Sequence, residues 1–363
     1  MFNTQRRFQS IQAMVVAFFM FLGFSPQDQS WFPQLQATEG PAGTLIVLNK
    51  SEASAWFIRL KDGQKIAEIP TGDGPHEVAI SPDGKTAVVT NYGGKTAGNT
   101  LTVIDIPNRS VVKTIDLEEY ARPHGILFFS NGKYVAVTAE ARQSLLVVEL
   151  PSGKIAKVIP TDQETSHMVA LAPDEKRAYV ANIRSNSISV LDIPGGKLEK
   201  IIPTGAGAEG IAVTPDGAHI WVSNRAEDTI SIIDATNLNI LRSLPCPGFP
   251  IRVQMSARSP VALVSCARAG DVKAFNWKTG EMLATIKMNV TAVQDTVSRL
   301  FRGVFGESPV PIGVLIHPSG KTAYIANSNA DVVVEIDLNS WKIVRFFRTG
   351  KQPDGLGFSP ISG

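Results

Sequence analysis

The sequence has little of what marks several common classes of protein. Its 363 residues include 2 Cys and 5 His, and the formal net charge at pH 7 is +2. Two cysteines cannot form a disulfide framework, a four-thiolate zinc site or an iron–sulfur cluster, and no CxxCH motif for covalent haem occurs. So small a charge does not favour nucleic acid as a partner. GxSxG, HExxH and P-loop motifs are also absent.

The first 37 residues differ in composition from the rest. Arg6 and Arg7 precede an almost wholly apolar run, AMVVAFFMFLGF, at residues 13–24. This run is shorter than the about 20 residues that span a bilayer, but it suits the hydrophobic core of a secretory signal. We therefore predict a signal peptide or N-terminal anchor over residues 1–37. The protein is then exported, periplasmic or extracellular, and any membrane contact is made through this segment.

The remaining chain, residues 38–363, repeats one sequence motif. Each copy has an alternating apolar strand, a turn similar to Pro-Asp-Gly, and a second apolar strand that often ends in Asn. The copies are spaced by 48, 43, 42, 42, 61 and 42 residues. They begin at Pro75, Pro123, Ser166, Ala208, Pro250, Pro311 and Pro353. A repeat of about 42 residues is typical of a propeller blade.

Turn signals within each copy predict four short antiparallel strands. Residues 43–72 supply three strands without a first one, and residues 353–360 supply a lone first strand. Together these segments complete one blade and leave no free sheet edge in the ring. The sequence therefore predicts an all-β, seven-bladed β-propeller of four-stranded antiparallel blades over residues 38–363.

The repeats resemble those of a known family. The segments VAISPDGKTAVVTN, VALAPDEKRAYVAN and LIHPSGKTAYIAN are similar to the YVTN-repeat β-propellers of exported bacterial and archaeal proteins. The resemblance implies a surface-layer-like or periplasmic binding protein. It extends more distantly to the tetrapyrrole-binding propellers of nitrite reductases and to sugar-lactone hydrolases. A shared fold does not fix an activity, so the candidate site must come from the residues.

The second residue of each copy is the first candidate position. First strands line the channel of a propeller, so these residues are expected near one mouth of it. In ring order they are His76, His124, His167, Glu209, Ile251, Ile312 and Asp354. Imidazole and carboxylate groups are ligands for zinc, copper and iron. We assign the three histidines as candidate metal ligands and Glu209 as a candidate general base. In the competing interpretation, the histidines are retained from a common ancestral repeat and only form hydrogen bonds that cap loops.

The third residue of each copy follows this candidate position, and in a regular strand its side chain points to the opposite side. We call this set the alternate register. It is mostly glycine, which would leave room for a ligand beside the polar arc. The full set is Glu77, Gly125, Met168, Gly210, Arg252, Gly313 and Gly355. The sequence does not decide which of the two registers points into the channel.

Cationic side chains mark the loops between second and third strands, which lie on the same face as the arc. We include Arg142, Arg184, Arg225 and Arg268 in the candidate ligand-binding set. Arginine suits bidentate binding of carboxylate or phosphate, which points to a small anion. Acidic residues in the same loops favour the alternative, ordinary solvated charge.

The copy spacing of 61 residues contains an insert, for which residues 289–308 are assigned. Its apolar residues recur at i, i+4 and i+8, which predicts a short amphipathic helix. This helix would lie over Ile251 and Ile312, either as a lid or as a docking site for a protein partner. Cys246 and Cys266 are expected to form a disulfide in an oxidising compartment, with metal ligation as the alternative.

These observations favour an exported binding protein whose funnel takes a small anionic or metal-containing ligand. The cofactor would be a transition metal (Cu, Zn or Fe) or a tetrapyrrole. Two other classes stay open. One is a metal-dependent oxidoreductase, lyase or lactonase that uses the His/Glu arc, and the other is a protein-interaction scaffold.

Overall fold

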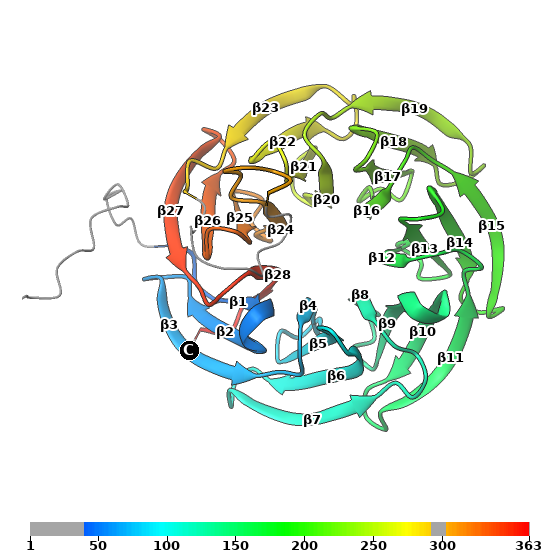
Figure 1. Cartoon of the computed structure of the whole chain (residues 1–363), viewed down its shortest axis with the longest axis horizontal. Helices are drawn as coiled ribbons and strands as arrows, with labels where there is room; N and C mark the ends of the chain where they lie inside the picture. The colour runs from blue at the N-terminus through cyan, green and yellow to red at the C-terminus, as the bar shows by residue number, and fades with distance from the viewer. Residues whose placement is uncertain (1–39, 292–302, 363) are drawn as a thin grey trace, which may run out of the picture. The chain divides into compact units, whose positions relative to one another are not determined.

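The computed structural model describes residues 40–291 and 303–362. Seven four-stranded sheets surround a central channel (Figure 1). The first strands line the channel and are β4 (Pro75–Ile80), β8 (Pro123–Phe128), β12 (Ser166–Leu171), β16 (Ala208–Val213), β20 (Pro250–Met255), β24 (Pro311–Ile316) and β28 (Pro353–Ser359). The second strands are β5 (Thr86–Gly93), β9 (Tyr134–Ala139), β13 (Arg177–Asn182), β17 (His219–Asn224), β21 (Val261–Cys266), β25 (Thr322–Asn327) and β1 (Thr44–Asn49).

The outer half of each blade follows the same order. The third strands are β6 (Ala97–Asp105), β10 (Ser144–Glu149), β14 (Ser187–Asp192), β18 (Thr229–Asp234), β22 (Asp271–Asn276), β26 (Val332–Asp337) and β2 (Ser54–Arg59). The outermost strands are β7 (Ser110–Asp116), β11 (Lys154–Pro160), β15 (Lys197–Pro203), β19 (Ile240–Pro245), β23 (Met282–Lys287), β27 (Lys342–Arg348) and β3 (Gln64–Pro70). Two 3₁₀ turns, η1 (Lys50–Glu52) and η2 (Glu140–Arg142), join second to third strands.

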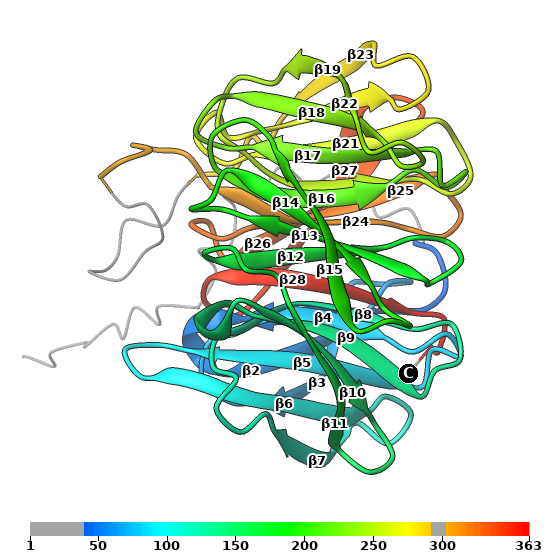
Figure 2. The same ribbon diagram turned by 90° about the vertical axis from the view of Figure 1, so that its right-hand side faces the viewer.

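The predicted fold is confirmed, including its closure. Strand β28 pairs antiparallel with β1, so that Thr44 lies opposite Ser359 and Ile46 opposite Gly357. The last strand of the chain thereby completes the sheet of the first three. Figure 2 shows the strands of the blades running from one face of the ring towards the other.

The Pro-Asp-Gly-like turns join first to second strands as expected. In the turn after β4, Gly84 has φ +73° and its N–H donates to the carbonyl of Ser81 at 2.8 Å. The carboxylate of Asp83 accepts from the N–H of Lys85 at 3.0 Å. Gly accepts this positive φ without the steric cost that a side chain adds. Asp stabilises the turn because its carboxylate accepts a hydrogen bond from a backbone N–H two residues on.

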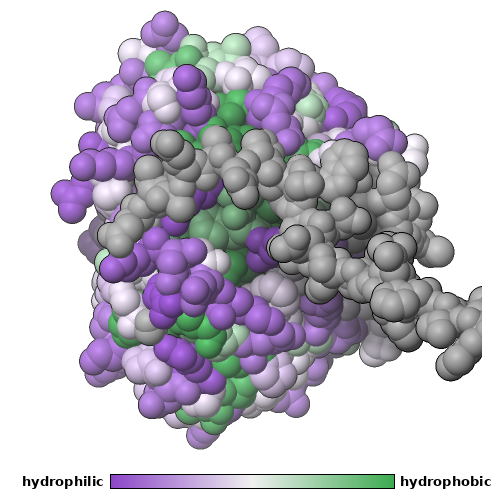
Figure 3. Space-filling view, turned by 90° about the vertical axis from the view of Figure 1, so that its left-hand side faces the viewer, coloured by the Kyte–Doolittle hydropathy of each residue, from purple (hydrophilic) through white to green (hydrophobic). Residues whose placement is uncertain are grey.

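The core lies between neighbouring blades, not inside any single sheet. For example, Val88 and Leu101 of one blade pack against Val135 and Leu146 of the next, all fully buried. Each such side chain contributes about 1.5–3 kcal/mol through burial. On the side of the ring in Figure 3, hydrophilic residues predominate and apolar residues form smaller patches.

Each first strand is irregular where it begins. In the β4–β5 pair, Pro75 lies opposite Asn91 but Val78 lies opposite Val89, so two residues, His76 and Glu77, face the single Thr90. The pairs β12–β13, β16–β17 and β24–β25 show the same shift. A β-bulge of this kind re-aims the side chains beside it. It therefore brings both candidate registers to the channel mouth.

Hydroxyl groups of the second strands fix these bulges. The Thr138 hydroxyl accepts from the N–H of Gly125 at 2.8 Å and donates to the carbonyl of His167, in the next blade, at 2.6 Å. Thr90 and Ser223 make the corresponding links to His124 and Ile251. The Thr or Ser of the repeat therefore positions the mouth residue of the next blade.

We expect Thr138→Val to lower the free energy of unfolding by about 1–3 kcal/mol, because it leaves a buried N–H and a buried carbonyl without their partner. Urea denaturation measures this change. The matched control is Thr114→Val, at an exposed position of the outermost strand β7, for which little change is expected. Equal losses in the two variants would contradict this role of the hydroxyl.

Two predicted segments fall wholly or largely outside the described residues. The predicted signal peptide or anchor, residues 1–37, lies outside them, and export stays a prediction. Residues 292–302 of the predicted insert helix also lie outside, and residues 303–308 form turns. Within residues 40–291 and 303–362, no helix is long and apolar enough to cross a bilayer.

Candidate functional site at the channel mouth

The polar residues predicted for the mouth lie next to one another. The imidazole rings of His76 and His124 are 5.0 Å apart between centroids, and those of His124 and His167 are 3.6 Å apart. His167 Nε2 lies 3.4 Å from Glu209 Oε1. His124, His167, Glu209 and Asp354 are all buried. The bulges therefore turn these side chains toward a shared polar layer.

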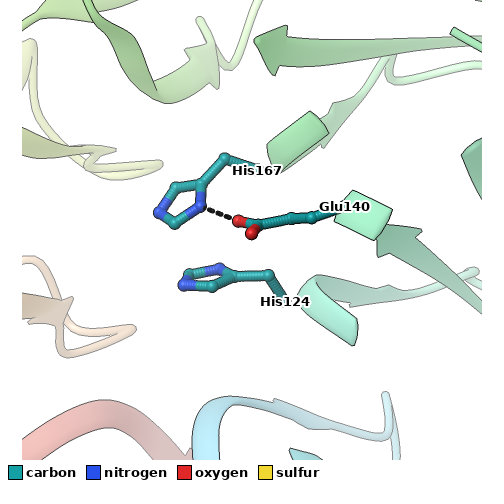
Figure 4. A group of neighbouring side chains, drawn as sticks. All are labelled: His124, Glu140 and His167. Carbon is teal, nitrogen blue, oxygen red and sulfur yellow. Dashed lines mark hydrogen bonds and ion pairs between the residues drawn. The ribbon is translucent and has the colours of Figure 1, made fainter. Parts of the chain in front are cut away.

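Three groups within this layer could hold a metal ion. His124 of β8, His167 of β12 and Glu140 at the start of η2 each offer one donor atom, and these atoms lie within 4.8 Å of one another. Figure 4 shows the Glu140 carboxylate pointing at His167 Nδ1, with the His124 ring beside both. The second carboxylate oxygen of Glu140 accepts from the Tyr92 hydroxyl at 2.7 Å. A ligand carboxylate held by a neighbouring donor is typical of metal sites.

The three histidines differ in charge. Burial, with Lys50 nearby, lowers the pKa of His76 to about 3. Burial and the neighbouring His167 hold the pKa of His124 well below its usual range. For His167, burial also acts to lower the pKa, but Glu140 and Glu209 outweigh it and raise the pKa overall. The neutral ring of His124 therefore lies between the neutral ring of His76 and the His167 ring, which favours its proton.

His76 has a fixed tautomer. Its Nδ1 donates to the carbonyl of Gly74 at 2.7 Å, which leaves the lone pair on Nε2. His76 lies outside the compact set of three donors but stacks near Tyr92, with ring centroids 4.4 Å apart. The structure thus places the first of the three predicted histidine ligands at the edge of the cluster.

Glu209 is held by cations, which does not suit a general base. Its carboxylate lies 2.6 Å from Arg225 and 3.4 Å from Arg252. Burial acts to raise its pKa, but His167 and the two arginines outweigh this effect and lower the pKa to about 2. A carboxylate with so low a pKa is a weak proton acceptor. Glu209 instead orients His167 from the side away from Glu140.

Asp354 forms the other end of the arc. Its Oδ2 lies 2.6 Å from Lys50 Nζ, and its Oδ1 is buried without a hydrogen-bond partner in the described part of the chain. Burial acts to raise the pKa of Asp354, but Lys50, His76 and Arg252 outweigh it and lower the pKa. Asp354 is therefore held as an anion.

Two of the four predicted arginines are engaged by carboxylates, and the anion site stays a prediction. Arg225 reaches Glu209, and Arg268 pairs with Asp228 at 2.7 Å. Arg142 is exposed and donates to the carbonyl of Glu119, and Arg184 is exposed. Arg225 and Arg268 both lie over the Phe249 ring, at 5.3 and 5.8 Å from its centroid, but each is already paired with a carboxylate.

An apolar sector completes the mouth, as the sequence suggested. Ile251, Ile312, Ala267 and Val310 form a small buried cluster against which Phe305, at the end of the insert, is packed. The ring of Phe305 lies 4.9 Å from that of Phe249. The described end of the insert therefore covers the isoleucine sector.

The predicted disulfide is not present, which corrects that interpretation. Cys246 and Cys266 are free, fully buried thiols whose sulfurs lie 3.7 Å apart, whereas a disulfide bond is about 2.05 Å long. Their contact with each other and burial raise the pKa of Cys246. They belong to an apolar cluster with Trp221 and Val264, so they pack as small hydrophobic side chains.

Glu77 and Arg252 are the residues whose pairing the sequence did not reveal. They are bonded at 2.6 Å, although their strands, β4 and β20, lie on opposite sides of the channel (Figure 1). Tyr92 and Glu140 also escaped prediction as site residues. The signal that could have found Glu140 is its position directly after the second strand, on the face of the histidines.

The glycines of the alternate register do not leave room for a ligand, which is a second correction. A Cβ on Gly313 would lie 2.0 Å from the Asp354 carbonyl oxygen, and one on Gly210 would lie 2.3 Å from the Ile251 carbonyl oxygen. The backbone of the next blade occupies that space. Gly is required here so that first strands can approach closely.

Fold and site together define a repeat β-propeller with a buried polar layer at one mouth of its channel. The family profile of the YNCE-like β-propellers matches residues 123–292, which confirms the predicted resemblance to repeat propellers. The chain is also 26% identical over 186 residues to hydrazine synthase subunit beta of Kuenenia stuttgartiensis. That match spans 50% of this chain and 42% of the relative.

Among solved structures, the chain is similar to a functionally unknown protein from Desulfotomaculum acetoxidans DSM 771. The TM-score is 0.72 at 15% sequence identity, over 88% of this chain and 99% of that one. At this identity the likeness shows a shared fold alone.

Proposed function

We propose that this propeller binds a transition-metal ion at its channel mouth through His124, Glu140 and His167. The observation that carries the proposal is the convergence of three donor atoms within 4.8 Å of one another. His124 is buried, and the side chains of His167 and Glu140 are 11% and 9% exposed. In addition, His124 Nδ1 is buried and has no hydrogen-bond partner among the described residues. A buried nitrogen without a partner costs free energy, and a bound ion would satisfy it.

A metal ion suits the mouth better than a small anion does. Anion binding needs cationic groups that are available, but Arg225 and Arg252 are engaged with buried carboxylates. Lys50 is engaged with Asp354 in the same way. The donors also converge on one point, which suits a bare ion better than a broad tetrapyrrole. Two imidazoles and one carboxylate are ligands typical of zinc, copper and iron.

A metal-dependent enzyme is the second candidate. Three protein ligands leave coordination positions for water or substrate, as in catalytic zinc sites. The similarity to a protein named as a subunit of hydrazine synthase supports the idea that this chain acts within an enzyme complex. Turnover of a candidate substrate that His124→Ala abolishes and His219→Ala retains would favour this candidate over binding alone.

Metal content and affinity test the proposal. We expect protein purified without chelator to contain one metal ion per chain by elemental analysis, and the chelated protein to rebind Zn²⁺ or Cu²⁺ by calorimetry. His124→Ala should weaken binding by at least about 100-fold, because it removes a ligand and not only an outer-shell partner.

His219→Ala is the matched control, because His219 lies at the start of β17 on the opposite face of the propeller. It should bind metal as the wild type does. Wild-type affinity in His124→Ala, or absence of metal binding by the wild-type protein, would refute the proposal.

A further inference from the structure

The channel contains a second feature beneath the polar layer. A cavity of about 330 Å³ is lined by residues of all seven first strands. Most of the side chains that line it are aliphatic, among them Ile126, Met168, Ile211, Val314 and Leu356, but polar groups contribute about as much of its accessible surface as apolar groups do. Cavities of this size fall at the lower end of the range for small-molecule sites.

The two ends of this cavity differ. At one end lie Glu77 and Arg252, whose ion pair spans the channel below the metal ligands. Leu127 also lines the cavity and is 37% exposed, so solvent reaches it. A ligand would therefore enter on the side of Leu127, away from the mouth, and meet Glu77 and Arg252 last.

The charge of the lining restricts what can bind. Among the residues that the structure describes, Glu77 and Arg252 are the only charged ones of the lining, and each neutralises the other. A charged ligand would have to compete with this pair and would lose its hydration among aliphatic side chains. The uncharged Gln254 adds one polar side chain, and its Oε1 accepts from the N–H of Ile316.

We propose that this cavity binds a compact, uncharged, largely hydrocarbon molecule with a single hydroxyl group, such as an aromatic or cyclic alcohol. Its hydrocarbon part fills the aliphatic channel, where burial of apolar surface drives binding. Its hydroxyl group both donates and accepts, so it can meet the Glu77 carboxylate without breaking the ion pair. Met168 and Met255 adapt their flexible side chains to the shape of the guest.

Titration with benzyl alcohol tests this site. For a probe of this size we expect a dissociation constant of about 1 mM by calorimetry. Ala212→Leu and Val314→Phe each fill the cavity and should weaken binding by at least about tenfold. Ala156→Leu, at an exposed position of the outermost strand β11, is the matched control and should bind as the wild type does.

Near-ultraviolet circular dichroism and the melting temperature report whether each variant is folded. Because there are two cavity-filling variants, the test can still be made if one of them does not fold. Benzoate and benzylammonium, the charged analogues, should bind at least about tenfold more weakly than the alcohol. Three results would overturn the proposal: no binding of benzyl alcohol, unchanged binding in both folded cavity-filling variants, or equal binding of the charged analogues.

Discussion

Arg252→Leu is expected to lower the free energy of unfolding by about 3 kcal/mol, because it removes one partner of a largely buried ion pair. The Arg252 side chain is 8% exposed and donates two hydrogen bonds to Glu77, at 2.6 and 3.0 Å. It also lies 3.4 Å from Glu209. Glu209 keeps Arg225 and His167 in the variant, so most of the loss comes from Glu77.

The loss should depend on pH in a defined direction. Burial already raises the pKa of Glu77, although Arg252 acts against this effect. Without Arg252 the folded-state pKa rises further, so the folded variant holds a proton that the unfolded chain releases. Its stability therefore falls relative to the wild type as pH increases, and the difference shrinks in acid.

Urea denaturation over a range of pH measures both effects. The matched control is Arg268→Leu, which removes an exposed partner of Asp228, with side chains 47% and 32% exposed. We expect this control to cost less than about 1 kcal/mol. The double variant Arg252→Leu/Glu77→Leu should cost less than the sum of the two single variants, because the orphaned carboxylate is gone. An Arg252→Leu loss no larger than that of the control would contradict a buried cross-channel pair.

The fold was predictable because its signals are local. Alternation, turn residues and the copy spacing all act within one blade of about 42 residues, and the same signals recur along the chain. Closure followed from counting strands at the two ends, and the pairing of β28 with β1 confirms it. Such features need no knowledge of distant contacts.

The site was predictable only in part. The position of His124 and His167 near the mouth followed from their place in the repeat, but their third partner, Glu140, lies in a loop with no repeated pattern. The bulge explains why the register could not be decided, since His76 and Glu77 both oppose Thr90.

The cross-channel contact between Glu77 and Arg252 could not be deduced at all. These residues are 175 positions apart and belong to blades that do not adjoin. Repeat patterns report the contacts within a blade and between neighbours, but the diameter of the channel depends on how seven blades close. Pairs across the channel therefore need coordinates.

Metal affinity at the mouth is expected to rise about tenfold per pH unit below the pKa of His167, because the ion must displace one proton from this imidazole. The groups that face His167 are Glu140, Glu209 and His124. Its raised pKa means that the proton is bound at pH values where a free histidine is already neutral. His124 contributes no proton near neutral pH, because its own pKa is lowered. Affinity should level off above the pKa of His167.

Zn²⁺ titration between about pH 6 and pH 8 measures this slope, and calorimetry in buffers of different ionisation enthalpy counts the released protons. Glu209→Gln removes one of the two carboxylates that raise the pKa of His167, so the levelling point should move to lower pH. Glu118→Gln, at an exposed position, should leave it unchanged. The pH at which affinity stops rising distinguishes proton competition from a general loss of affinity. Weaker binding alone lowers the affinity at every pH and leaves that pH unchanged. A slope near zero would show that the ion binds without displacing the His167 proton, and would remove His167 from the ligand set.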